Sequence, residues 1–335
     1  MFTMTSDISI GQHRHVKASR VTWKSSTTDY TDICTLTLPL APYVSHRDQT
    51  TTQIGSDMTW SDSCAFKKGD AVLVSLGYDG RNHEVFRGFV LRVNFRDQLV
   101  LDCEGYAFLL RDRYMSKSYA KTTLRQILQD LTSGTDILLS PSIDNIQLTN
   151  VWFKNAPAHR VLEWLKKECC CQVFFDGQYL YAGASRYVYA DPSRSTLPQK
   201  ARIGWNVVSA DDLKKNVAEQ VQIHIVEKSA AGQVKKTKSE QKRYDDVREV
   251  KVRAGLPDDF LRRAVKQLQD DQNHGGYEGS ITLFGEPHVF KADTIRITDE
   301  RFPERAGNYF VESVDGSYGE DGFRRKLKLR WYSHD

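Results

Sequence analysis

The chain has 335 residues, of which 40% are hydrophobic and 27% charged, and its formal net charge is +4. These are values of a globular protein with room for two or three domains, and the charge is too small for a general nucleic-acid binder. No apolar run approaches the ~20 residues that cross a bilayer, and the N-terminus lacks the basic and apolar regions of a secretory signal. We therefore expect a protein folded in a cytoplasm, with its six cysteines as free thiols.

Residues 1–112 are predicted to form mainly strands. Cys34, Leu36 and Leu38 alternate with threonines until Pro39 ends the run. The sequence "GYDG" at 77–80 supplies residues that tolerate positive φ, so it predicts a hairpin turn. Residues 41–66 are polar and have no clear period, which fits either a surface loop or a contact arm.

Residues 113–200 are predicted to form a small α/β domain. One helix is capped by Thr122 or Thr123 and stops at Gly134, and a second has Pro157 in its first turn. Short strands lie around these helices, at 146–153 and 171–183. Residues 190–202 form the exit linker. The apolar stripe of the first helix consists of Leu124, Ile127, Leu128 and Leu131.

Strands return in residues 201–335, at 221–227 and 248–254. A third helix opens at Pro257 and ends at Gly275-Gly276. The final segment, "RKLKLRW" at 325–331, alternates apolar and basic residues and is predicted to be a strand.

The two ends of the chain carry the same pattern. "KKGDAVLVSLGYDG" at 67–80 and "FKADTIRITDE" at 290–300 both place a lysine and a small residue before an aspartate and an alternating strand. Each is followed by a strand with glycine, aromatic and valine residues and by another alternating run. We expect Gly69-Asp70 and Ala292-Asp293 to lie at equivalent strand starts in two similar β-barrels. Two similar barrels offer similar lateral surfaces, through which copies of the chain could close head-to-tail into a ring.

Several stretches, in this order, resemble the baseplate hub family of contractile phage tails, also called late control protein D. They are "VTWKSSTTDYTDICTLTLP" (21–39), "GDAVLVSLGYDG" with "FRGFVLRVNF", "KTTLRQILQDL", "WFKNAPAHRVLEWLKKECCCQVFFDGQYLYAG", "GYEGSITLFGEPHVFKADTIRITD" and "GNYFVESVDGSYGEDGFRRKLKLRW". The same fold forms the base of VgrG-type injection spikes. Residues 41–66 are longer and more polar than is usual for this family.

The resemblance implies a β-rich α+β fold in which two tube-type β-barrel domains, at 1–112 and 201–335, flank an inserted α/β domain at 113–200. It implies a structural hub: a homotrimeric, pseudo-sixfold ring that joins the tail tube to a central spike in the virion tail or baseplate, assembled in the host bacterial cytoplasm. The implied partners are the tail tube protein, the spike protein, other baseplate proteins and the tape-measure protein, with genomic DNA in transit through the lumen. No membrane partner is implied.

Two groups of residues could suggest a metal or redox site. Cys169, Cys170 and Cys171 are consecutive and lack the paired spacing of a zinc site, so a helix-to-strand junction with buried thiols is favoured. His13 and His15 lie on a predicted strand without an evident acidic or cysteine partner, so a polar strand face is favoured. We predict no metal, no cofactor and no catalytic residue.

The segment at 232–246 holds the strongest basic run, with Lys235, Lys236, Lys238, Lys242 and Arg243. It is predicted to be a long hairpin tip between two strands. It is either a solvated loop or an electrostatic contact with an acidic neighbour or with DNA in transit.

Motifs of hydrolases, nucleotide-binding proteins and zinc proteases are absent from the sequence. Asp258-Asp259, directly after Pro257, fits the start of a helix better than an acid/base pair, and the same alternative applies to Asp211-Asp212. We therefore predict a structural protein and not an enzyme. The alternatives are a tail-tip cell-wall hydrolase, a DNA-binding module that uses 232–246, and a spike component of a related injection system.

Overall fold

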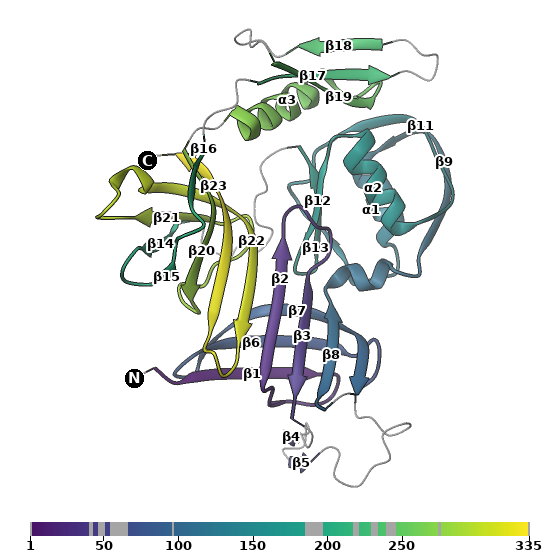
Figure 1. Cartoon of the computed structure of the whole chain (residues 1–335). Coiled ribbons are helices and arrows are strands. Elements are labelled where there is room, and N and C mark those ends of the chain that lie inside the picture. The colour runs from purple at the N-terminus through teal and green to yellow at the C-terminus, as the bar shows by residue number, and fades with distance from the viewer. Residues whose placement is uncertain are drawn as a thin grey trace. The chain divides into compact units, whose positions relative to one another are not determined.

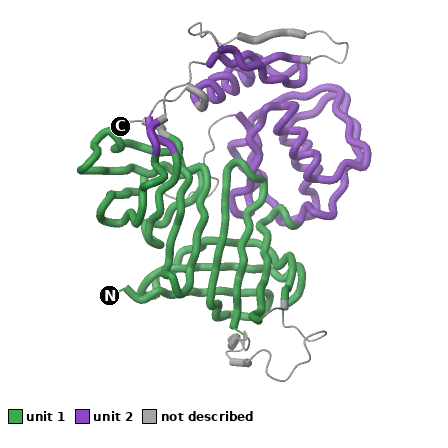
Figure 2. The backbone as a smooth tube through the Cα atoms, viewed as in Figure 1, with its two compact units in different colours: residues 1–108, 196–213, 279–335 green, residues 109–195, 214–278 purple. Residues whose placement is uncertain are grey.

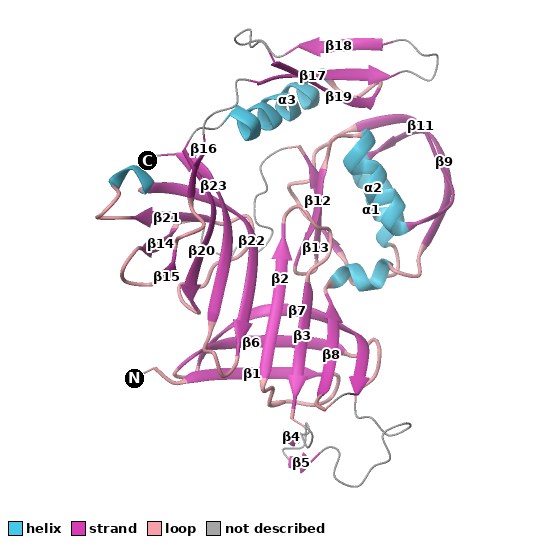
Figure 3. Cartoon of the chain, in the orientation of Figure 1, coloured by secondary structure: helices cyan, strands magenta, loops and turns pink. Residues whose placement is uncertain are grey.

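The computed structural model describes residues 2–39, 43–45, 51–53, 66–95, 97–184, 197–216, 221–228, 234–238, 246–273 and 276–333. Strands dominate the chain, with three α-helices in the described parts (Figure 3). The β-rich α+β fold class predicted from the sequence is confirmed. The chain forms two compact units: residues 1–108, 196–213 and 279–335 make unit 1, and residues 109–195 and 214–278 make unit 2 (Figure 2).

The first repeat of unit 1 is a curved sheet of six strands in the spatial order β1-β6-β7-β8-β3-β2. In Figure 1, β1, β6 and part of β7 run across β2, β3 and β8. Buried residues from all six strands form one apolar core between them, including Ile8, Val21, Leu36, Val74 and Leu101. The strands are β1 (Met4–Ile10), β2 (Arg20–Ser26), β3 (Ile33–Leu38), β6 (Ala71–Tyr78), β7 (Arg81–Phe95) and β8 (Leu99–Glu104).

The second repeat has the same order in space and in sequence: β14-β21-β22-β23-β20-β15. One difference is that β14 pairs parallel with β21, whereas β1 pairs antiparallel with β6. The strands are β14 (Gln199–Arg202), β15 (Val207–Ser209), β20 (Gly276–Phe284), β21 (Thr294–Thr298), β22 (Gly307–Tyr318) and β23 (Arg324–Ser333). The predicted duplication is therefore present as a repeated strand topology.

A matching backbone hook, at residues 67–70 and 290–293, directly precedes β6 in the first repeat and β21 in the second. The N–H groups of Gly69 and Ala292 each donate to a valine carbonyl, of Val90 and of Val311, at 2.8 Å in both cases. Each valine N–H donates back to the carbonyl of the following aspartate, at 2.9 Å in both cases. The register of the next strand pair slips just after Val90 in the first repeat and just after Val311 in the second, which has a further irregularity between Asn308 and Tyr309. The predicted equivalence of Gly69-Asp70 and Ala292-Asp293 is correct.

The two repeats share one thirteen-stranded sheet, because β2 of the first pairs with β22 of the second. Consequently, eight strands run continuously in the order β7-β8-β3-β2-β22-β23-β20-β15. The sequence pattern predicted two barrels but not this shared strand pair.

Unit 2 contains the predicted α/β elements. Thr123 caps α1 by accepting a 3.1 Å hydrogen bond from the Gln126 N–H, and the predicted stripe of α1 is buried. Pro157 directly precedes α2, and Gly177 at φ 56° turns β12 into β13. The elements are β9 (Tyr114–Thr123), α1 (Leu124–Thr132), β10 (Leu138–Leu139), β11 (Gln147–Pro157), α2 (Ala158–Glu168), β12 (Gln172–Asp176) and β13 (Tyr179–Gly183).

The second segment of unit 2 joins the first through two arginines. Arg263 of α3 donates to the buried Asp144 carboxylate at 2.7 Å. Arg253 of β19 donates to the carbonyls of Thr149 and Asn150 and lies over the Trp164 ring. The elements are β16 (Lys214–Asn216), β17 (Val221–Lys228), β18 (Val234–Lys238), β19 (Asp246–Arg253) and α3 (Asp258–Asn273). The domain limits at 112 and 200 stay a prediction.

The prediction for residues 232–246 as a hairpin tip is wrong in its topology. β17 and β19 pair in parallel, so they are not the two arms of one hairpin. β18, which lies within the predicted tip, pairs antiparallel with β17 on its other side. Residues 229–233 and 239–245 lie outside the described residues.

The segment at 41–66 lies mostly outside the described residues as well. Within it, β4 (Tyr43–Ser45) and β5 (Thr51–Gln53) pair antiparallel. Residues 185–196, which include most of the predicted exit linker, are also outside the described parts.

Candidate interaction surfaces

The eight-stranded part of the sheet has one buried face and one polar face. Neighbouring strands place Asp102, Thr35, Thr22, Ser317 and Arg324 in one row across the polar face. The residues next to them along the strands, such as Leu101, Leu36 and Val21, point into the core. This alternation is typical of antiparallel sheets with one solvated face. The polar face crosses from one repeat to the other without interruption.

The internal seam between the repeats is the pairing of β2 with β22, with six residues in each strand. Val21 to Ser26 of β2 lie opposite Tyr318 to Ser313 of β22. Thr27 continues the contact, since its N–H and Oγ1 both donate to the Glu312 carbonyl, at 3.0 and 3.2 Å. Thus β22 pairs with β21 at its start and with β2 of the other repeat after residue 312.

Side-chain packing at the seam depends on a glycine. The Trp23 indole lies over Gly316, where an added Cβ would come within 2.0 Å of the ring. Trp23 also contacts Phe323 with a centroid distance of 6.0 Å. Because Trp23 comes from one repeat and Gly316 and Phe323 from the other, this contact fixes the two repeats against each other.

Arg325 is a buried charge beside the same seam, with 2% of its surface exposed. It donates to the carbonyls of Gly285 and Val289, and its guanidinium lies 5.5 Å from the Trp23 ring centroid. Burial lowers the pKa of Arg325 to about 10, so the group still carries its charge at neutral pH. Its hydrogen bonds and the aromatic faces offset part of the desolvation cost.

A buried ion pair forms the far end of the seam. The Lys291 ammonium, on a side chain 3% exposed, lies 2.5 Å from an Asp32 carboxylate oxygen. Asp32 stands in the turn between β2 and β3, and Lys291 stands in the hook before β21. The pair therefore joins the two repeats directly.

Both ends of the eight-stranded sheet are open edges. On the side of β7 that faces β6, pairing stops at Phe89, although β7 continues to Phe95 and pairs with β8 on its other side. At the opposite end, β15 pairs with β20, and an isolated bridge joins Val207 to Ile203. In the described chain, no further strand covers either edge. Unpaired backbone groups at such edges can accept another strand.

Exposed apolar side chains gather at the β15 edge. Trp205 is 77% exposed in the turn before β15, and Val208 of β15 is 46% exposed. Phe284 of β20 is 40% exposed, and its N–H donates to the Asn206 carbonyl beside Trp205. Exposed aromatic residues beside an open strand edge are typical of a protein-interaction surface.

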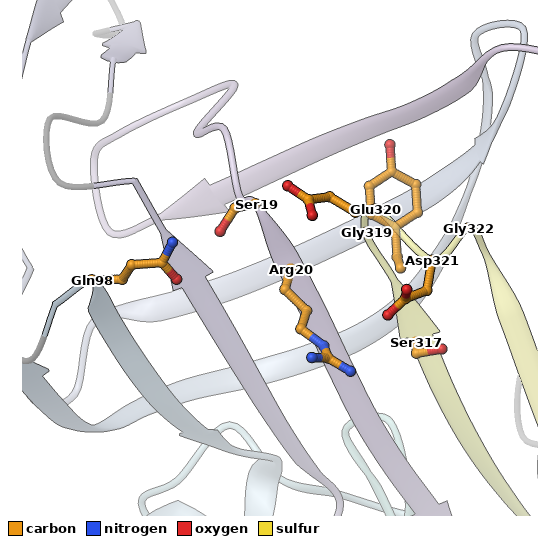
Figure 4. A pocket seen from close by; sticks show the side chains of 9 residues that line it. Ser19, Arg20, Gln98, Ser317, Gly319, Glu320, Asp321 and Gly322 are labelled. Carbon is orange, nitrogen blue, oxygen red and sulfur yellow. The ribbon is translucent and has the colours of Figure 1, made fainter.

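A small polar pocket of about 180 Å³ opens at one end of the seam. It is lined by the start of β2, by Gln98 before β8, and by the turn between β22 and β23. In the view of Figure 4, Arg20 lies between Gln98 and the acidic residues Glu320 and Asp321. Both repeats contribute to it, so we assign it to the seam.

The two histidines of the H-x-H pair lie in different surroundings. His13 and His15 were expected on a strand, but β1 ends at Ile10 and Gly11, at φ 56°, turns the chain. His13 is buried with its ring edge-on to Phe66, whereas His15 is exposed beside Asp7. The expectation of a strand is therefore wrong, because Gly11 turns the chain before His13 and because His15 itself has a positive φ of 52°.

The cysteines follow the structural interpretation. The five described cysteines are free, and Cys169 to Cys171 occupy the junction between α2 and β12. Cys170 takes a positive φ of 54°, and Cys169 and Cys171 on either side of it are buried. Among the described residues, no three histidine, cysteine or acidic side chains form a group that could hold a metal ion.

The two acidic pairs have structural partners. Asp258 and Asp259 lie in the first turn of α3, as predicted, where they face the positive end of the helix dipole. Asp212 instead accepts hydrogen bonds from Ser280 and Lys326, and Asp211 accepts one from Ser209. None of the helices in the described parts of the chain combines the length and apolar character of a membrane span.

No protein-family model and no sequence of a curated protein matches the chain. Solved structures do match over nearly its whole length. A tail protein from Neisseria meningitidis MC58 aligns over 97% of this chain and 96% of its own, with a TM-score of 0.63 at 12% identity. The 43 kDa tail protein of prophage MuSo2 from Shewanella oneidensis aligns over 98% and 97%, with a TM-score of 0.62 at 14% identity.

A component of the E. coli type VI secretion system, described as structurally similar to T4 tail proteins, aligns over 97% of this chain and 77% of its own, with a TM-score of 0.55 at 11% identity. At such low identity these matches establish a common fold and leave the activity open. The chain therefore has the fold of these phage tail proteins, which it shares with a component of a bacterial secretion system.

Proposed function

We propose that this chain is a structural tail hub that assembles head-to-tail into a trimeric ring. The observation that carries the proposal is the relation between the internal seam and the two open edges. Within one chain, β2, the end strand of the first repeat, pairs with β22 beyond its slip in register. In the second repeat, the end strand that corresponds to β2 is β15, and no strand pairs with its outer edge in the described chain. In the first repeat, the strand that corresponds to β22 is β7. The part of β7 after Phe89, which corresponds to the part of β22 that pairs with β2, has no partner strand on that side among the described residues.

The strand pairing that joins β2 to β22 within one chain can therefore form again between two chains, with β15 of one copy in the place of β2 and β7 of the next copy in the place of β22. Such a contact uses two different surfaces, so it propagates around an axis and closes when the rotation allows. Three copies would each contribute eight strands to one closed sheet, in which neither end of the eight-stranded run stays open. The exposed aromatic residues near β15 would be buried by the incoming copy.

In this proposal, residues 1–112 and 201–335 carry the ring, and residues 113–200 are an inserted domain. The ring, of the type called late control protein D, would join a sixfold tail tube to a central spike in the virion tail. The tape-measure protein and then DNA would pass through its lumen, and the polar face of the sheet would line that lumen. No catalytic role belongs to the proposal, and the chain would assemble in the host cytoplasm.

Light scattering and negative-stain averages of the purified protein test the ring. We expect a trimer-sized particle with six similar lobes. Val208→Asp should give a folded monomer, because a carboxylate would be buried at the edge of β15. Val247→Asp is the matched control, since Val247 is also a strand valine, 43% exposed, but lies in unit 2. A wild-type chain that stays monomeric, alone and with its spike protein, would contradict the proposal.

A spike base of a contractile injection system is the second candidate. It is supported by the match to the type VI secretion component, of which this chain covers 77%. Mass spectrometry of purified virions separates the two roles, because a tail hub must be present in the particle.

A further inference from the structure

Two lysines occupy the same position in the two hooks. The N–H of Lys67 donates to the Asp70 carboxylate at 2.7 Å, and that of Phe290 donates to the Asp293 carboxylate at 2.6 Å. These bonds, with the matching bonds to Val90 and Val311, align the hooks residue by residue. Lys68 then corresponds to Lys291.

The surroundings of the two lysines differ completely. Lys291 is buried against Asp32, which belongs to the other repeat. Lys68 is exposed. The difference follows from the topology, because the second repeat has the first repeat beside its hook across the seam. In the described part of the chain, no other repeat lies beside the hook of the first.

The register of the repeats identifies the region that would face Lys68. Cys34 of β3 lies opposite Cys103 of β8, and Gly279 of β20 lies opposite Leu329 of β23. Cys103 and Leu329 occupy equivalent positions in the two repeats, because they pair with the equivalent valines Val90 and Val311. Their other partners, Cys34 and Gly279, are therefore equivalent as well. Asp32 lies two residues before Cys34, and Tyr277 lies two residues before Gly279, so Tyr277 takes the position of Asp32.

Glu278 follows Tyr277 along β20 and is therefore an acidic residue next to the position that corresponds to Asp32. It is exposed, and its cross-strand neighbour on β16 is Lys214. It occupies the position of Ile33, which is 50% exposed in the first repeat.

We infer that Lys68 of one copy pairs with Glu278 of the next copy, as the intermolecular counterpart of the pair between Lys291 and Asp32. The inference rests on the proposed ring and names residues of its interface. If the next copy encloses Lys68, its ammonium group needs a carboxylate partner, because an unpaired buried charge weakens the association of the two copies. A complementary charge on the next copy also fixes the register of the interface.

Charge reversal tests the pair in the full-length protein. Lys68→Glu and Glu278→Lys should each raise the dissociation constant of the ring by at least about tenfold, because each places like charges together. The double variant should recover most of this loss. Sedimentation velocity over a concentration series measures all three, and thermal unfolding checks that each variant folds.

A second double variant provides a matched control. Lys68→Glu with Asp211→Lys reverses another exposed carboxylate near β15, and it should show no recovery. If the wild-type ring forms but Lys68→Glu assembles normally, or the first double variant does not recover, the inference fails and the ring stands. If the wild-type protein forms no ring, both fail.

Discussion

Asp70 and Asp293 accept the same hydrogen bond in two repeats at opposite ends of the chain. Each carboxylate receives the backbone N–H of the residue three positions earlier, at 2.7 and 2.6 Å. Each residue also bonds through its own carbonyl to the valine N–H of the following strand. The two hooks therefore have one geometry, and small differences between them have measurable consequences.

The residue before each aspartate has a positive φ, at 92° for Gly69 and 65° for Ala292. An alanine side chain is unfavourable in this conformation. We expect Ala292→Gly to raise the free energy of unfolding by about 0.5–1 kcal/mol and Gly69→Ala to lower it by about 1–2 kcal/mol. A Cβ on Gly69 would meet no atom within 4 Å, so the loss there is conformational. Urea denaturation measures both, and changes of the same sign would contradict the equivalence of the hooks.

The ion pair between Lys291 and Asp32 should be sensitive to the loss of one partner. Asp32→Ala leaves a buried ammonium without its carboxylate and should lower the free energy of unfolding by about 3 kcal/mol. The double variant with Lys291→Met and Asp32→Ala should lose less free energy of unfolding than Asp32→Ala alone, because it removes the buried ammonium charge together with its carboxylate. Thermal or urea unfolding gives the comparison.

Asp29 supplies the control for this pair. It lies 3.9 Å from Lys24, and both side chains are more than half exposed. Asp29→Ala should change stability by less than about 0.5 kcal/mol. Equal losses for Asp29→Ala and Asp32→Ala would show that the burial of Lys291 has no energetic effect.

Gly316 determines how closely the two repeats approach. Gly316→Ala would place a Cβ 2.0 Å from the Trp23 ring, so it should lower the free energy of unfolding by about 3 kcal/mol. In Gly105→Ala the nearest atom to the new Cβ is Asp32 Cβ at 3.4 Å, an ordinary contact, and the loss should be much smaller. Similar unfolding midpoints for the two variants would mean that the seam can relax around the added methyl group.

The buried thiols should make the fold sensitive to alkaline pH. Burial raises the pKa of Cys103 and of Cys169 to about 12, whereas an unfolded thiol ionises near about 8.5. Between these values the unfolded chain loses protons that the folded chain keeps. The stabilisation is therefore complete below pH ~8.5 and falls as pH rises, by up to about 1.4 kcal/mol per pH unit for each thiol.

Urea unfolding at several pH values between neutral and about pH 10 checks this dependence. A variant with Cys103→Ala and Cys169→Ala should show a shallower fall, since tyrosines and lysines remain to titrate in both proteins. Identical slopes would show that these two thiols do not contribute.

Local patterns were sufficient for much of the fold. Thr123, Gly134 and Pro157 mark helix limits by backbone chemistry that needs no distant partner. The sequence located Gly134 and Pro157, and it narrowed the cap to Thr122 or Thr123. The repeated lysine, small residue and aspartate before an alternating strand likewise indicated two related β-units.

Long-range strand pairing was not accessible in the same way. β17 and β19 read as a hairpin in sequence but pair in parallel, because a strand pattern does not state the direction of its partner. The burial of Arg325 was also missed, since an arginine in an alternating basic run looks solvent-exposed until the Gly285 and Val289 carbonyls and the Trp23 ring surround it.

The sequence by itself determined the repeats, the helix limits and the fold class, because side-chain alternation, caps and turn residues act over a few positions. Only the tertiary structure decided that β2 pairs with β22, that Lys291 is buried while Lys68 is exposed, and that the two edges stay open. Those outcomes depend on register and on which surfaces meet, and they are set by the burial of apolar area between segments that are far apart in the chain.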